Sequence, residues 1–302
     1  MSRRAFLGTT AAALLLPKTE PDTETIIDIH QHTNYSGRSD EDLIAHQRKM
    51  GISLTVLLPA GSLYGLDANA GGNQSVLELA RRRPSRFLFF ANEVPDLPGA
   101  RREIEKYLRA GAIGIGEQKF RVECDSRHIE MLAEIARQFH VPILMHFQHG
   151  AYNTGIERFH RILGKHTRVN FIGHAQTWWG NIAKNHDQAV MYPKTRVTPG
   201  GITDRLLADH ANMYGDLSAG SGLNALLRDE EHAREFLARH QDKLLYGSDC
   251  NDRDGEGEKC IGARQIATIR RLAPTPTVAG KILAGNAIRL LRLQGFTADP
   301  RR

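Results

Sequence analysis

The chain has few cysteines, no long hydrophobic run and no large excess of charge of either sign, and each lack excludes a class of protein. Its 302 residues include only Cys124, Cys250 and Cys260. This odd number without a CxxC pair excludes a disulfide scaffold and a zinc-ribbon site. The sequence leaves two alternatives for the cysteines: one disulfide between Cys250 and Cys260, or three free thiols. No stretch reaches the roughly 20 apolar residues of a membrane-spanning helix, so we expect no stable membrane anchor.

The charge balance is only mildly basic. The net charge is +6, and Arg3 and Arg4 contribute two of these charges. The remaining excess slightly favours an anionic substrate or surface, but it is too small and too scattered to predict a nucleic-acid partner. With 41% hydrophobic and 25% charged residues, the composition is that of an ordinary globular protein, and we expect a small-molecule substrate.

The first 22 residues are expected to form an export segment rather than part of the fold. Arg3 and Arg4 precede Phe6 and Leu7, and a short run of small and apolar residues follows over 9–16. This pattern resembles a twin-arginine signal; a disordered basic tail is the alternative. We therefore expect the twin-arginine export machinery as a partner during secretion, a periplasmic or extracellular location, and one folded domain over 23–302.

From Thr25 onward, short β-rich apolar runs alternate with helical patterns, which is typical of a parallel α/β sheet. The first run lacks the glycine-rich phosphate loop of an open doubly wound sheet, and eight β/α units in a chain of this length favour a closed (β/α)₈ TIM barrel. Residues 175–200 are expected to form an ordered loop and residues 223–240 one long helix. The eight predicted strands are 26–30, 54–59, 87–93, 113–119, 143–147, 169–174, 213–217 and 244–249.

Side chains that can coordinate a metal ion lie at the ends of several of these runs. His30 and His32 are two residues apart, so on a strand both imidazoles point to the same side and can reach one ion. The fifth, sixth and eighth runs end in His146, His174 and Asp249. In a barrel the carboxyl ends of the strands meet at one face, where active sites are built. The pattern therefore predicts a metal site at that face.

The fourth run carries Glu117 and Lys119, again two residues apart. A carboxylate there would bridge two metal ions, and a lysine would do so after carboxylation. The alternative is an internal ion pair between Glu117 and Lys119 that touches no metal.

These motifs resemble the amidohydrolase superfamily, and specifically its amidohydrolase-related (amidohydrolase-2) branch, over residues 26–293. Asn286 and the segment Asp216-Leu217-Ser218 are also similar to that branch. Members bind one or two divalent ions with an HxH pair on strand one, a residue on strand four, His on strands five and six, and Asp on strand eight. Many relatives carry lysine on strand four, whereas the glutamate here resembles variants such as the TatD-type nucleases. The resemblance implies the ligands His30, His32, Glu117, His146, His174 and Asp249, with two ions if Glu117 bridges and one if it does not.

The expected chemistry is metal-dependent hydrolysis. A divalent ion of the zinc type activates a water molecule, Asp249 accepts its proton as general base, and His174 helps to polarise the scissile bond. The substrate is expected to contain an ester, lactone or amide bond. Neither its identity nor the oligomeric state can be read from the sequence. Candidate substrate contacts are Trp178, Trp179, His149, Lys119, Asn251 and Arg253, with lid packing as the alternative for the two tryptophans.

Three other functions remain open from the sequence. A metal-dependent decarboxylase of the same branch would use a similar site without the strand-four bridge, so Glu117 favours hydrolysis. A TatD-like phosphodiesterase fits the basic pI but fits the aromatic loop and the export signal less well. A non-catalytic metal-binding barrel is disfavoured, because a degenerate site is expected to have lost ligands.

Overall fold

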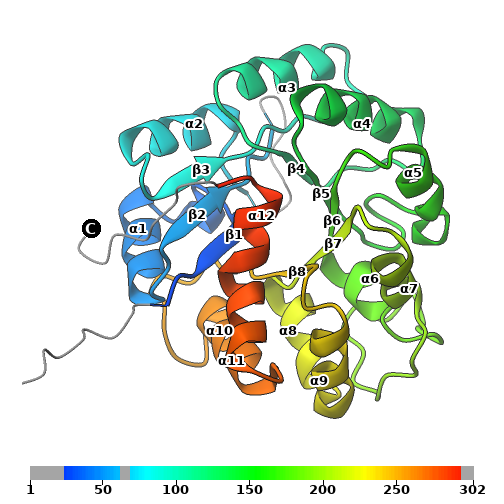
Figure 1. Ribbon diagram of the computed structural model, residues 1–302. Coiled ribbons are helices and arrows are strands. Elements are labelled where there is room, and N and C mark those ends of the chain that lie inside the picture. Colours follow the sequence, from blue (N-terminus) through cyan, green and yellow to red (C-terminus); the bar gives the residue numbers. More distant parts are fainter. Residues whose placement is uncertain (1–23, 62–68, 294–302) are drawn as a thin grey trace, which may run out of the picture.

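The computed structural model describes residues 24–61 and 69–293, so the expected export segment lies outside the described residues. Strands and helices alternate along the chain (Figure 1). The strands are β1 Ile27–Gln31, β2 Leu54–Leu57, β3 Phe87–Phe89, β4 Ile115–Gln118, β5 Ile143–His146, β6 Phe171–His174, β7 Met213–Asp216 and β8 Leu244–Leu245. The main helices are α1 Asp40–Lys49, α2 Asn73–Arg82, α3 Ala100–Arg109, α4 Arg127–Phe139, α5 His160–Lys165, α6 Ala175–Gly180, α7 Ile202–Asp209, α8 Ala219–Leu227, α9 Glu230–Arg239, α10 Ile261–Leu272, α11 Pro276–Gly280 and α12 Asn286–Leu290. None of the helices in the described part of the chain combines the length and apolar character needed to cross a membrane.

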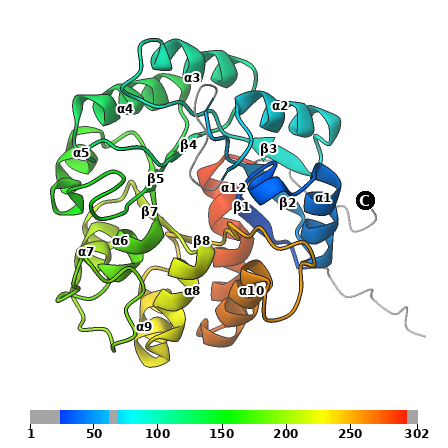
Figure 2. The same ribbon diagram turned by 180° about the vertical axis from the view of Figure 1, so that it is seen from behind.

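The eight strands form one closed parallel barrel. Hydrogen bonding joins β1 to β3 in order and β4 to β8 in order. A parallel bridge between Ala91 and Ile115 connects the two groups on one side. On the other side the backbone N–H of Ile29 donates to Tyr246 O at 3.2 Å. The helices surround this ring (Figures 1 and 2), which confirms the (β/α)₈ TIM barrel predicted from the sequence.

Apolar side chains fill two layers, one inside the ring of strands and one between strands and helices. The inner cluster includes Ile27, Val56, Leu144 and Ile172, and it packs against α12, which lies across one end of the barrel (Figure 1). The interior is therefore a filled core and not a pore, as expected for a barrel of this size. The carboxyl ends of the strands lie at the opposite end, where buried polar side chains gather.

Two register shifts decide which residues face the interior. Between β1 and β2, Asp28 pairs with Thr55 but Gln31 pairs with Leu57, so β1 contains one extra residue. Such a bulge turns the following side chains to the other face of the sheet. It brings His30 and His32 to the side of Ile27, which belongs to the inner cluster.

The same irregularity occurs in β4. Ile115 pairs with Ile143 and Gln118 pairs with Met145, so β4 contains one residue more than the matching part of β5. Glu117 then faces the interior although Ile115, two residues earlier, packs in the outer layer. Gly116 permits this path, because its φ is +136° and a Cβ there would lie 2.8 Å from Leu144 O.

Two expectations for the helices are wrong. Residues 223–240 form two helices, α8 and α9, because Asp229 leaves the helical conformation and its carboxylate accepts from His232 N at the start of α9. The segment 175–200 is not a loop throughout, because α6 follows β6 directly. Gly173 allows this packing, since a Cβ there would lie 2.4 Å from the Trp178 ring.

Candidate metal centre

Six side chains from five strand ends converge on one point of the barrel mouth. They are four imidazoles and two carboxylates, and all six are buried or nearly so. The structure places all the sequence-predicted ligands in this cluster, in three overlapping groups of three. They are His30, His32, Glu117, His146, His174 and Asp249.

The two histidines of β1 present their Nε2 atoms to each other at 3.3 Å. His32 Nδ1 donates to Leu58 O at 2.7 Å, and His30 Nδ1 lies 2.7 Å from Asp216 Oδ2. Both Nε2 lone pairs are therefore free and face each other, which is unfavourable unless a cation or a proton lies between them. Two imidazole nitrogens on one tetrahedral zinc ion stand about 3.3 Å apart, so this pair fits a metal.

Glu117 connects this pair to the other histidines. Its Oε2 lies 3.6 Å from His30 Nε2 and 3.5 Å from His32 Nε2. Its Oε1 lies 2.5 Å from His146 Nδ1 and 3.8 Å from His174 Nε2. Each carboxylate oxygen therefore faces a different pair of imidazoles, which is the arrangement of a bridge between two ions.

Asp249 also faces both sides of the centre. Its Oδ1 lies 3.4 Å from His32 Nε2, and its Oδ2 lies 3.7 Å from His174 Nε2. The backbone holds this residue in the left-handed region at φ 41°, and its N–H donates to His30 O at 2.8 Å. Such conformations are uncommon outside glycine and concentrate at functional sites.

The electrostatics keep the two carboxylates charged. Burial alone would raise the pKa of Glu117, but His146 and His30 outweigh it and hold that pKa well below its usual range. Burial likewise opposes the charge of Asp249, but His30 and His32 lower its pKa. Ionised carboxylates are the form that binds a metal.

The pKa values of two of the histidines, His30 and His174, are shifted in opposite directions. Burial disfavours a charged His30, yet Asp249 and Asp216 raise its pKa well above the usual value, so without a metal a proton takes the place of the cation. Burial and the neighbouring His30 lower the pKa of His174 to about 4, so His174 is neutral near pH 7. Neutral imidazole is the ligand form.

Three residues that sequence reasoning gave no role support the ligands. Asp216 accepts from His30 and from Ser218 Oγ, at 2.7 and 2.8 Å, and Ser218 Oγ lies 3.0 Å from His174 Nδ1. Tyr35 contacts Asp249 through its hydroxyl, and this carboxylate together with burial raises the tyrosine pKa. The position of Asp216 at the end of the seventh run was a usable signal, whereas Tyr35 begins a single 3₁₀ turn, Tyr35–Gly37, that has no sequence pattern.

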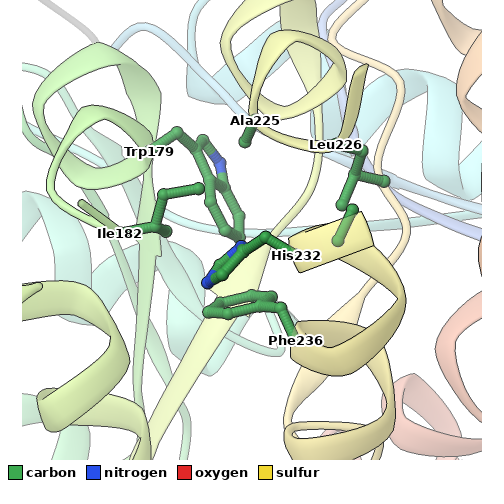
Figure 3. A pocket seen from close by; sticks show the side chains of 7 residues that line it. Trp179, Ile182, Ala225, Leu226, His232 and Phe236 are labelled. Carbon is green, nitrogen blue, oxygen red and sulfur yellow. The ribbon is translucent and has the colours of Figure 1, made fainter. Parts of the chain in front are cut away.

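The two tryptophans are not a substrate wall. Trp178 is fully buried and stacks on Phe147, with ring centroids 5.8 Å apart. Trp179 is 2% exposed, and its Nε1 donates to Asp216 O at 2.9 Å. Figure 3 shows Trp179 beside His232 and Phe236 in a small pocket whose lining is mostly apolar. The prediction that these rings stack on a substrate is wrong; the packing alternative holds.

The other candidate substrate contacts lie at the barrel mouth with varied exposure. His149 is exposed, and its backbone N–H donates to Thr177 Oγ1 at 2.6 Å. Lys119 is half-buried with its ammonium 5.6 Å from the centre of the Tyr152 ring, so it forms no ion pair with Glu117. Asn251 donates to Ser36 Oγ at 3.2 Å, and Arg253 lies 3.8 Å from Asp42 on α1. Substrate binding by these four residues stays a prediction.

The barrel, with potential metal ligands gathered at its mouth, defines a scaffold of the TIM-barrel class. The amidohydrolase family model matches residues 27–293, so the chain belongs to this family and the predicted branch is confirmed. No curated protein matches the sequence significantly.

Solved structures agree with this fold. An uncharacterised TIM-barrel protein from Bordetella bronchiseptica is 17% identical, with 90% of this chain and 100% of that chain covered and a TM-score of 0.63. A structure described as a putative 2-pyrone-4,6-dicarboxylic acid hydrolase from Pseudomonas putida is 15% identical, with coverage of 90% and 98% and a TM-score of 0.61. The 2,6-dihydroxybenzoate decarboxylase from Rhizobium is 14% identical, with coverage of 90% and 100% and a TM-score of 0.57. At these identities the likeness supports the fold alone.

Proposed function

We propose that the protein is a metal-dependent hydrolase of an ester, lactone or amide bond in a small substrate. The observation that carries this proposal is the position of Glu117, whose two oxygens face two different pairs of histidines. A carboxylate placed in this way suits two ions. A two-ion site held by these residues would supply polarisation of the scissile carbonyl and an activated water, whereas the decarboxylases of this branch work without a strand-four bridge.

The donor set fits divalent ions of the zinc type, because four imidazoles and two carboxylates are borderline and hard ligands. His30, His32 and Glu117 would hold one ion and Glu117, His146 and His174 the other, and Asp249 forms a further ligand group with His30 and His174. When bound, such an ion lowers the pKa of a coordinated water from about 15.7 to about 7.

The side chains around the ligands supply the remaining chemistry. Asp249 is ionised and buried at the centre of the mouth, so it can accept a proton from the attacking water as general base. The same carboxyl group can then donate that proton to the leaving group. The Tyr35 hydroxyl, which remains protonated, stands beside Asp249 to stabilise negative charge that develops on the substrate, and neutral His174 would assist through the ion that it helps to hold.

The experiment compares the metal content of wild type, Glu117→Gln and Glu93→Gln, and it includes a substrate panel. Glu93 is a matched control, since it is a buried carboxylate after β3 outside the ligand groups. Glu117→Gln is expected to lose about one bound ion per chain relative to wild type, while Glu93→Gln loses none.

The panel holds esters, lactones including pyrones, amides, and aromatic carboxylates that release carbon dioxide. The pyrones and aromatic carboxylates enter because of the solved structures of a putative pyrone hydrolase and a decarboxylase. Hydrolysis by wild type together with loss of one ion in Glu117→Gln supports the proposal. Carbon dioxide release with an unchanged ion count in Glu117→Gln refutes it in favour of a decarboxylase.

We also propose that residues 1–22 direct export through the twin-arginine route, which supports a periplasmic or extracellular location. The support is the pair Arg3 and Arg4 before a short apolar run. Replacing both arginines with lysine is expected to leave the protein inside the cell. Normal export of that double variant, measured by fractionation, contradicts the proposal.

A further inference from the structure

A second group of potential metal ligands lies apart from the centre described above. His46 comes from α1, and Cys250 and Cys260 lie in the segment 246–260 between β8 and α10, with Cys260 directly before α10. His46 and Cys260 are 0% exposed and Cys250 is 2% exposed. The proposed hydrolysis gives these three side chains no role. Both views show the segment before α10 passing beside α1 (Figures 1 and 2).

The distances between the ligand atoms match a single ion. The Sγ atoms of Cys250 and Cys260 lie 3.9 Å apart, and His46 Nε2 lies 3.4 Å from Cys260 Sγ. A tetrahedral zinc ion, with bonds of about 2.3 Å to sulfur and about 2.0 Å to nitrogen, places two sulfurs about 3.8 Å apart and a sulfur and a nitrogen about 3.5 Å apart. The three side chains therefore already stand at ligand spacing.

The surroundings also favour a thiophilic ion. Met50 Sδ lies 3.6 Å from Cys260 Sγ, and Asp252 Oδ2 lies 4.0 Å from His46 Nε2, so both flank a fourth position. The polar contacts of the His46 ring run through Nε2, the atom that faces Cys260 and Asp252. Cys260 caps the start of α10, where its Sγ accepts from Ala263 N at 3.4 Å, and a helix N-terminus stabilises a thiolate.

We propose that His46, Cys250 and Cys260 bind a structural zinc(II) ion, or a divalent ion of the same thiophilic class, in addition to any metal at the catalytic centre. Binding exchanges the two thiol protons, which pass to solvent, for two sulfur–metal bonds. Two thiolates and one divalent cation sum to zero charge, which satisfies the requirement that buried charges be compensated.

Such an ion would position the catalytic carboxylate. Cys250 directly follows Asp249, and its carbonyl accepts from Gln31 Nε2 and Arg38 Nη1, each at 2.8 Å. Gln31 lies between the two histidines of β1. An ion on Cys250 would therefore fasten α1 and the start of α10 to the segment that carries Asp249.

Cobalt(II) is the probe that separates this site from the catalytic centre. Thiolate ligands give cobalt a strong charge-transfer absorption in the near ultraviolet, whereas the nitrogen and oxygen ligands of the catalytic centre give none. The full-length chain is first reduced, then stripped of metal, and finally titrated without oxygen. We expect the thiolate band at saturation to correspond to about one thiolate-bound cobalt ion per chain, whatever further cobalt the catalytic centre takes up.

Four variants complete the test. Cys260→Ser and Cys250→Ser are each expected to lose most of the band, while Cys124→Ser, a buried free cysteine elsewhere, keeps it. Glu117→Gln keeps it as well, so failure of the hydrolase proposal and failure of this one are distinguishable. Absence of the band in reduced wild type overturns the proposal, and so does a full band in Cys260→Ser. The wild-type spectrum decides even if a cysteine variant fails to fold.

Discussion

His30 Nδ1 lies 2.7 Å from Asp216 Oδ2, and both side chains are completely buried. The pair joins β1 to β7 across the barrel mouth. It fixes the ring so that Nε2 faces His32. A carboxylate behind a metal-binding imidazole sets its tautomer and raises its basicity.

Removing the negative charge from Asp216 is expected to weaken metal binding without removing a ligand. Asp216→Asn should lower metal affinity about 10- to 100-fold, measured by competition with a chelator of known affinity. The matched control is Asp204→Asn, which alters a similar pair, at 2.6 Å, between Asp204 on α7 and His240 directly after α9. Equal affinities in wild type and Asp216→Asn would show that the pair has no such function.

Replacing the proposed general base, Asp249, should lower the rate of hydrolysis while metal binding is largely kept. Asp249→Asn keeps the size of the side chain and one potential ligand oxygen, so most of the metal should stay bound. The rate of hydrolysis should fall about 10²- to 10⁴-fold. Asp254→Asn, an exposed position in the same segment, is the control and should retain full activity. A fully active Asp249→Asn enzyme would rule out this assignment.

Tyr35→Phe removes only the hydroxyl that contacts Asp249. We expect kcat to fall about tenfold, which corresponds to the loss of one hydrogen bond of about 1.4 kcal/mol. Stability should change little, because Tyr35 is only partly buried. Tyr192→Phe is the control, since that exposed tyrosine contacts Gln176 instead. An equal decrease of kcat in both variants would contradict a specific role of Tyr35 and point to a general effect of losing a hydroxyl group.

The pH dependence of the metal-free protein should reveal the buried imidazole of His174. Its pKa is about 4 in the fold against 6.5 for the free side chain. Because the unfolded state binds the proton first, His174 destabilises the fold as the pH falls below 6.5, and the effect is complete near pH 4. The shift corresponds to about 3 kcal/mol.

Urea unfolding of metal-free wild type and His174→Asn tests this expectation. Wild type should lose up to about 3 kcal/mol more than the variant between about pH 7 and pH 4. His30 has a raised pKa and therefore the opposite effect: its protonation stabilises the fold at low pH, and that stabilisation is lost as the pH rises. Both proteins contain His30, so the difference between their stability curves largely removes its contribution. Parallel stability curves for the two proteins would contradict the expectation.

Trp178→Phe should affect stability rather than substrate binding. The indole is fully buried against Phe147, so the smaller ring leaves a cavity and should cost roughly 1–3 kcal/mol in unfolding free energy. KM should stay at the wild-type value. A raised KM in a protein of unchanged stability would restore the interpretation of this ring as a substrate contact.

The sequence by itself determined the class of fold and the identity of the ligands. Alternating apolar runs and helices require a parallel sheet, and polar residues at the ends of such runs must meet at one face. His146 and His174 could be identified because each directly ends an apolar run, and Asp249 because it follows such a run within a few residues, so that their place depends only on local pattern.

Only the tertiary structure decided which way the remaining groups point. The period-two rule correctly pairs His30 with His32, but the bulges in β1 and β4 alone bring that pair and Glu117 to the interior. The rule cannot locate a bulge, because an extra residue is defined by the neighbouring strand. The same holds for Asp216, Tyr35 and the buried tryptophans, whose contacts join segments far apart in the chain. Side-chain burial and pairing are set by packing between elements, and that information is not local.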